Sequence, residues 1–172
     1  SLPAIALGLE PPDKKIMDKK PRDNRKSIFA DGLWGKIFVE GIMLGMLTLI
    51  SFNIGTNLYG VEVGRTMAFV SLGLLELIHS FNIKSEESIF KIGLLENKYL
   101  IGAFILGTLL QIIVVVVPGF ASVFKLVPLN SIQWLYIAAI SVVPVVVMEL
   151  QKAVNGFKIE KKVYSYKTSK SV

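Results

Sequence analysis

Four long apolar runs constrain this chain more than any other feature of its sequence. They occupy residues 37–58, 66–81, 99–117 and 132–148. A bilayer core of about 30 Å needs roughly 20 helical residues, and each run reaches that length once its flanks are included. Helices satisfy their backbone hydrogen bonds within the segment, as a lipid environment requires. The sequence therefore predicts an all-α integral membrane bundle of four transmembrane helices.

The composition agrees with this prediction. Hydrophobic residues make up 52% of the chain and charged residues 19%, whereas about a quarter of the residues in a soluble domain are charged. The chain contains no cysteine, which excludes disulfide frameworks, thiolate zinc sites, iron–sulfur clusters and cysteine nucleophiles.

The positions of lysine and arginine predict how the helices are oriented. Of the 19 such residues, all but Arg65 and Lys125 precede the first run, separate the second from the third, or follow the fourth. Cytoplasmic loops carry the excess of positive charge in membrane proteins. We therefore expect a multi-pass cell-membrane protein with both termini and residues 82–98 in the cytosol. The basic residues flank spans and form no single groove or helix face, which argues against a nucleic-acid partner.

The same runs divide the chain into three parts. Residues 1–32 are expected to be a cytosolic loop, residues 33–157 the four-span membrane domain, and residues 158–172 a disordered basic tail. The chain opens at Ser1 in the middle of a motif, without an initiator methionine or signal peptide. We therefore expect it to be a fragment of a longer protein.

The second run contains the main candidate functional residue, Glu76, and His79 follows it one turn later on the same face. An ionisable side chain at this depth costs roughly 2.5–3.5 kcal/mol, so it must face protein, water or an ion. Glu76 is therefore a candidate ion-binding group, and a structural carboxyl is the alternative. His79 is expected either to contact a ligand of that site without touching the ion, or to have a packing role only. A di-iron site needs two Glu-x-x-His pairs, and the chain has one histidine.

The first run carries two weaker signals. Glu40 follows Lys36 by four residues near the cytosolic interface, a spacing that predicts a surface ion pair. Gly41 and Gly45 form a small-xxx-small pattern that allows the backbone of another helix to come close. The residues alone thus indicate one incomplete cation site and no complete chemistry.

A family resemblance extends this interpretation. Residues 1–22, SLPAIALGLEPPDKKIMDKKPR, resemble the cytosolic loop that follows the sixth transmembrane helix in type II P-type cation ATPases. Later segments fit as well, namely TMAF at 66–69, HSFNIKS at 79–85, VPLNSIQW at 127–134 and ELQK at 149–152. The resemblance implies spans seven to ten of a ten-helix transporter, closest to bacterial calcium-transporting ATPases of the sarcoplasmic-reticulum type.

The resemblance also implies roles for particular residues. Glu76 would contribute one carboxylate to a calcium site whose other ligands lie on the fourth, fifth and sixth helices, outside this chain. Gly41 and Gly45 match a glycine pair that packs against the fifth helix. A coupling loop, through which the membrane bundle contacts the phosphorylation domain, would contain Pro11, Pro12, Asp13 and Asp18.

For the parent protein, the resemblance implies a calcium-translocating ATPase that uses ATP and magnesium. Its phosphorylation motif and nucleotide-binding domain are absent from this chain, so we expect the chain alone to be inactive. Its implied partners are the lipid bilayer and the remaining helices and cytosolic domains of the same pump. Two alternatives stay open. The same family transports other cations, such as sodium and potassium, protons or manganese, and a non-transporting four-helix membrane scaffold is also possible.

Overall fold

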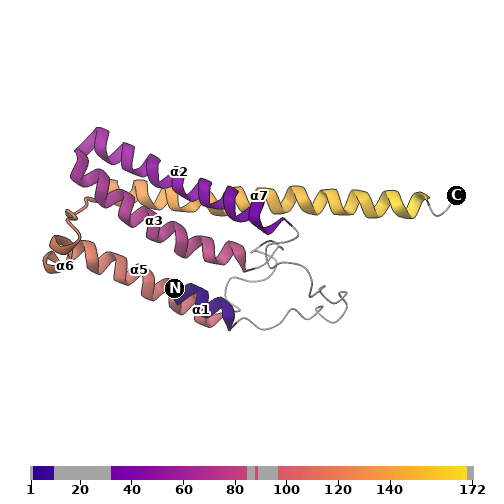
Figure 1. Ribbon diagram of the computed structural model, residues 1–172, viewed down its shortest axis with the longest axis horizontal. Helices are drawn as coiled ribbons and strands as arrows, with labels where there is room; N and C mark the ends of the chain where they lie inside the picture. The colour runs from indigo at the N-terminus through magenta and orange to yellow at the C-terminus, as the bar shows by residue number, and fades with distance from the viewer. Residues whose placement is uncertain (1, 10–31, 85–87, 89–96, 170–172) are drawn as a thin grey trace.

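The computed structural model describes residues 2–9, 32–84, 88 and 97–169, with side chains as far as Val154 (Figure 1). Within these parts of the chain every regular element is a helix, as the sequence predicts. The helices are α1 (Leu2–Gly8), α2 (Leu33–Tyr59), α3 (Val61–Ile83), α5 (Lys98–Val116), α6 (Pro118–Val123) and α7 (Ser131–Ser169).

The four long helices run alternately up and down the bundle. Helices α2 and α3 form an antiparallel hairpin whose turn is Gly60, with a φ of 98° that glycine adopts without steric cost. This turn and α6 lie at one end of the bundle, and the start of α2, the end of α3 and the start of α5 lie at the other (Figure 1). Four helices, α2, α3, α5 and α7, therefore run along the length of the bundle in the described part of the chain.

Among the described residues, three helices are long and apolar enough to cross a membrane: α2, α5 and the Ser131–Val154 part of α7. Helix α3 is not among them, so a count of four spans stays a prediction. Helix α3 packs against α2, α5 and α7 and has nine buried residues, against three each in α2 and α5. It is the central helix of the bundle, and its neighbours cover much of its apolar surface.

The main core gathers around α3, where Met67 and Val70 are fully buried. Val115 of α5 and Ile137 of α7 pack into the same cluster. The outer faces of the helices are also apolar, and Phe38 on α2, for example, is 68% exposed. Apolar surface on this scale marks contact with lipid or with other protein.

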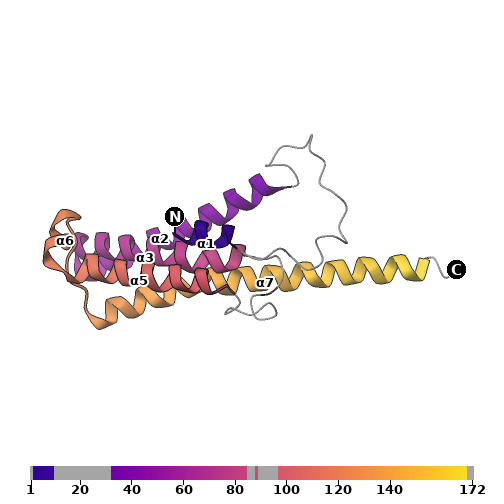
Figure 2. The ribbon, with the colours of Figure 1, turned by 90° about the horizontal axis from the view of Figure 1, so that it is seen from below.

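The segments before α2 and after the membrane part of α7 both contain helix. The expected amino-terminal loop contains α1, which packs on α5 through Ala6 against Leu100 and Ala103. The Asn97 Nδ2 donates a hydrogen bond of 3.0 Å to the carbonyl oxygen of Ala6 and holds α1 in place. Helix α7 continues to Ser169 and extends past the other helices (Figure 1 and Figure 2), and the disorder expected of residues 158–172 stays a prediction. The sequence contains no proline after Pro144 that would end this helix.

The start of α7 shows how local sequence fixes a helix end. The Asn130 Oδ1 accepts a hydrogen bond from the backbone N–H of Gln133 at 2.9 Å, and the Gln133 Oε1 accepts one from the N–H of Asn130 at 2.8 Å. This reciprocal pair is a capping box, in which two side chains satisfy backbone donors that the first helical turn leaves free.

Candidate functional site

Glu76 lies in the second half of α3, with its side chain exposed between the buried Leu75 and Leu77. No hydrogen bond or ion pair joins its carboxylate to any described residue. Helix α3 thus turns its apolar side chains toward the bundle and its acid outward. The prediction that Glu76 lies inside the membrane domain and faces something other than lipid therefore depends on what covers this outer face.

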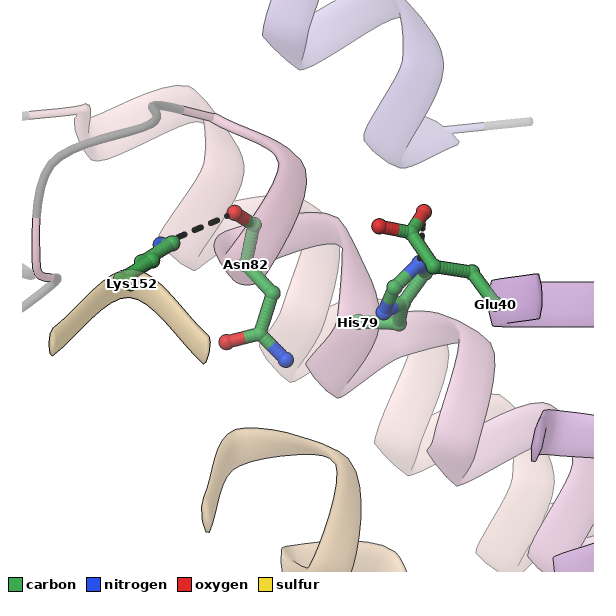
Figure 3. Close-up of polar contacts among 4 residues, drawn as sticks. All are labelled: Glu40, His79, Asn82 and Lys152. Atoms are coloured by element: carbon green, nitrogen blue, oxygen red, sulfur yellow. Dashed lines mark hydrogen bonds and ion pairs between the residues drawn. The ribbon is translucent and has the colours of Figure 1, made fainter. Parts of the chain in front are cut away.

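His79 lies one turn beyond Glu76 but contacts a different acid. Its Nε2 is 3.3 Å from Oε2 of Glu40 on α2, and both side chains are 12% exposed (Figure 3). No hydrogen bond joins His79 to Glu76. The sequence predicts that Glu40 pairs with Lys36, whose side chain is exposed. The crossing of α2 and α3 instead brings together two residues 39 positions apart, a contact that spacing along one helix does not reveal.

A second polar contact joins the end of α3 to α7. The Lys152 Nζ donates a hydrogen bond of 3.2 Å to the backbone oxygen of Asn82 (Figure 3). The last carbonyls of a helix lack partners within it, and a lysine supplies one here. Lys152 also lies 3.6 Å from Glu149, which accepts a hydrogen bond from the Ser88 hydroxyl. No local pattern predicts the contact with Asn82, whereas Glu149 and Lys152 lie three residues apart on α7, a spacing that favours an ion pair.

The described residues supply only part of a cation site. Among them, no three His, Asp or Glu side chains come together closely enough to hold a metal ion. Calcium takes six to eight oxygen ligands, and the exposed carboxylate of Glu76 provides at most two. Any calcium site that includes Glu76 must therefore be completed by other groups.

The remaining predicted residues fall into two groups. Gly41 and Gly45 are exposed on α2, and a Cβ added at either would meet nothing within 4 Å. The close contact they were predicted to make is therefore not made within the described chain. The predicted coupling loop lies outside the described residues, and this applies to Pro11, Pro12, Asp13 and Asp18 alike.

Comparison with known proteins decides the family. The model of the family described as "Cation transporting ATPase, C-terminus" matches residues 1–154 of this chain. The chain belongs to this family. It is 35% identical over 170 residues to calcium-transporting ATPase 1 of Bacillus cereus, covering 88% of this chain and 19% of that protein. It is 34% identical over 145 residues to a calcium-transporting ATPase of Bacillus subtilis, covering 83% of this chain and 16% of that protein.

A more distant relative extends the range of organisms. The chain is 31% identical over 173 residues to calcium-transporting ATPase type 2C member 1 of Pongo abelii, covering 97% of this chain and 19% of that protein. The chain thus spans about a fifth of the length of these curated relatives. Membership of the cation-transporting ATPase family confirms the resemblance found in residues 1–22 and in the later segments. The roles of Glu76, His79, Gly41 and Gly45 stay predictions.

Proposed function

We propose that this chain is the carboxy-terminal membrane domain of an ATP-driven calcium pump, in which Glu76 supplies one carboxylate to the ion site. The observation that carries the proposal is the outward-facing carboxylate of Glu76 on the central helix of a membrane domain. An ionised carboxylate within a bilayer is costly unless protein, water or an ion meets it. A cation held between α3 and further helices of the pump would meet that need.

The relatives support calcium as the transported ion, because those described above are named calcium-transporting ATPases. Calcium prefers hard oxygen ligands, and a carboxylate is among the strongest. The rest of the coordination shell would come from the other helices of the pump, and ATP and magnesium would act in its cytosolic domains. The coupling loop of Pro11, Pro12, Asp13 and Asp18 would connect those domains to the bundle.

The proposed topology has four spans, with both termini in the cytosol of a multi-pass cell-membrane protein. Helix α3 has 23 residues, which at 1.5 Å per residue gives about 35 Å and exceeds the thickness of a bilayer core. In this arrangement His79 would act on Glu76 only indirectly, because its hydrogen bond holds α3 to Glu40 of α2. Alternating access would expose Glu76 to the cytosol for ion binding and then to the opposite side for release.

The proposal is tested by substituting Glu76 in the full-length pump. Glu76→Gln keeps the size of the side chain but removes its charge, so calcium-activated ATP hydrolysis should require at least about tenfold more calcium, equivalent to about 1.4 kcal/mol. Phosphorylation by inorganic phosphate, which needs no bound calcium in this family, should persist. Glu62→Gln is the matched control, because Glu62 is also exposed on α3 but lies in its first turn.

Three outcomes would contradict the proposal. An unchanged calcium midpoint in Glu76→Gln, together with a lower melting temperature in Glu76→Ala, would make Glu76 a structural carboxyl. Activation of the wild-type pump by another cation in place of calcium would keep the family and change the substrate. Absence of any cation-dependent hydrolysis by the full-length protein would favour the scaffold alternative.

A further inference from the structure

The side-chain amide of Gln111 on α5 lies directly against the backbone of α3 at Gly73. A Cβ added to Gly73 would lie 2.6 Å from Cδ of Gln111 and would overlap the amide nitrogen. The amide therefore occupies the space that any side chain at position 73 would fill. Glycine at this position permits such a close approach because it has no side chain.

The amide oxygen of Gln111 has no partner in this place. Oε1 is buried and accepts no hydrogen bond from the part of the chain that the structure describes. A buried acceptor without a donor is destabilising, whereas an apolar side chain of similar shape would avoid that cost. Packing against Gly73 alone would therefore favour methionine, which has similar length and flexibility. The unpaired oxygen is available to a hydrogen-bond donor or to a cation from outside the described residues.

Glu76 lies one turn beyond Gly73 on the same side of α3. Residues three positions apart on a helix have their Cβ atoms about 5–6 Å apart. The Gln111 amide occupies the Cβ position of Gly73, so it is about this far from the Cβ of Glu76. Two oxygens that each bind one calcium ion at about 2.3–2.6 Å can be up to about 5 Å apart. The Glu76 carboxylate and the Gln111 amide are therefore within reach of the same ion.

We propose that Gln111 binds the same cation as Glu76 through its amide oxygen, so that α3 and α5 both contribute to the ion site. This inference rests on the proposed function of Glu76 and adds a neutral ligand from a second helix of the chain. Calcium accepts amide oxygens as well as carboxylates. Rotation about the last side-chain bond of Gln111 exchanges the positions of Oε1 and Nε2, and this torsion is broad, so the oxygen can turn toward the ion.

The test measures equilibrium binding of radioactive calcium to the full-length pump, together with calcium-activated ATP hydrolysis. Gln111→Met removes the amide oxygen, so the calcium dissociation constant should rise by about threefold or more. The rise should be smaller than in Glu76→Gln, because the lost ligand is neutral. Gln111→Glu keeps an oxygen at the end of the side chain and should bind calcium more tightly than Gln111→Met. Ser141→Ala is the matched control, because it removes a buried oxygen without a described partner from α7, and it should leave the dissociation constant unchanged.

The melting temperature in the absence of calcium separates a ligand from a structural amide. Gln111→Met should leave this temperature unchanged or raise it, because it removes an unpaired buried acceptor. A lower calcium-free melting temperature with unchanged calcium binding would instead mean that the amide bonds to another helix of the pump, and would overturn the proposal.

Two further results would also overturn the role of Gln111. They are an unchanged dissociation constant in Gln111→Met, and binding by Gln111→Glu that is no tighter than binding by Gln111→Met. If Glu76→Gln still weakens calcium binding in either case, the proposed function stands and only the role of Gln111 fails. Unchanged calcium binding in Glu76→Gln would remove the carboxylate from the site, and a shared ion with it, whatever the Gln111 variants do.

Discussion

Gly55 of α2 and Gly64 of α3 bring the backbones of their two helices into direct contact. A Cβ at position 55 would lie 2.6 Å from the Cα of Gly64, and a Cβ at position 64 would lie 2.8 Å from the backbone oxygen of Phe52. Further along the same interface, the hydroxyls of Ser51 and Ser71 are 2.7 Å apart and both side chains are fully buried. Lipid tails are as apolar as the surfaces of these helices, so the hydrophobic effect does not drive the helices together. Small residues instead allow the close van der Waals packing that holds them in contact.

Gly64→Ala should therefore destabilise the α2–α3 hairpin. The added methyl group would overlap backbone atoms, which cannot move aside as a flexible side chain does, so the cost should be about 1–3 kcal/mol or more. The measurement is the thermal or denaturant midpoint of the chain in detergent. Gly102→Ala on α5 is the matched control, because a Cβ there meets nothing within 4 Å. A midpoint for Gly64→Ala equal to that of the control would mean that the helices are not packed this closely.

A second glycine supports the contact between α3 and α5. The Gln111 side chain of α5 lies over Gly73 of α3, where a Cβ would overlap its amide group. Gly73→Ala should lower the stability by about 1–3 kcal/mol, and Gln111→Ala in the same chain should restore most of the loss by removing the overlapping side chain. A double-mutant cycle measures this coupling. Additive effects of the two substitutions would show that they do not share a contact.

The sequence predicted the features of this fold that depend on local pattern. Long apolar runs correspond to α2, α5 and most of α7 because the length of an apolar helix is encoded within one segment. The capping box of Asn130 and Gln133 is local in the same way, since both partners lie within one helical turn. The family followed from the motif in residues 1–22, whose spacing is specific.

Contacts between helices were not predictable in the same way. The pairing of Glu40 with His79 and of Lys152 with the Asn82 carbonyl depends on how α2, α3 and α7 cross. The small-residue pattern at Gly41 and Gly45 was visible in the sequence, but the glycines that bring the backbones of α2 and α3 into contact are Gly55 and Gly64, which do not follow that spacing. A sequence pattern shows that a helix can pack closely, and the partner helix decides where.

The predicted topology can be checked with single introduced cysteines, because the chain has none of its own. In sealed vesicles of known orientation, cysteines replacing Val61 and Ser122 should react with a membrane-impermeant thiol reagent that is applied to the extracellular face of the membrane. A cysteine replacing Ser88 should react only from the cytosolic side. The physical reason is the excess of lysine and arginine around the 82–98 segment, which opposes its translocation. Reaction of the cysteine at position 88 from outside the cell would show that the orientation is the reverse of the predicted one.

The last prediction concerns Gly41 and Gly45, which are exposed in the chain although their spacing favours close helix packing. Because a Cβ at either position meets nothing, Gly45→Ala should leave the stability of the isolated chain unchanged or raise it by up to about 1 kcal/mol, through better helix propensity. If this face of α2 packs against another helix of the pump, the same substitution should destabilise the full-length protein.

Measuring the melting temperatures of the isolated chain and of the full-length pump separates the effect of helix propensity from the effect of packing against another helix. Gly64→Ala should lower the melting temperature in both contexts, because its clash lies within the chain. Gly45→Ala should lower it only in the full-length protein. Gly45→Leu should exaggerate that difference, since a larger side chain holds the two helices further apart. A full-length pump that tolerates Gly45→Leu without loss of melting temperature or activity would show that this face of α2 meets lipid, and the glycine pair would then have no packing role.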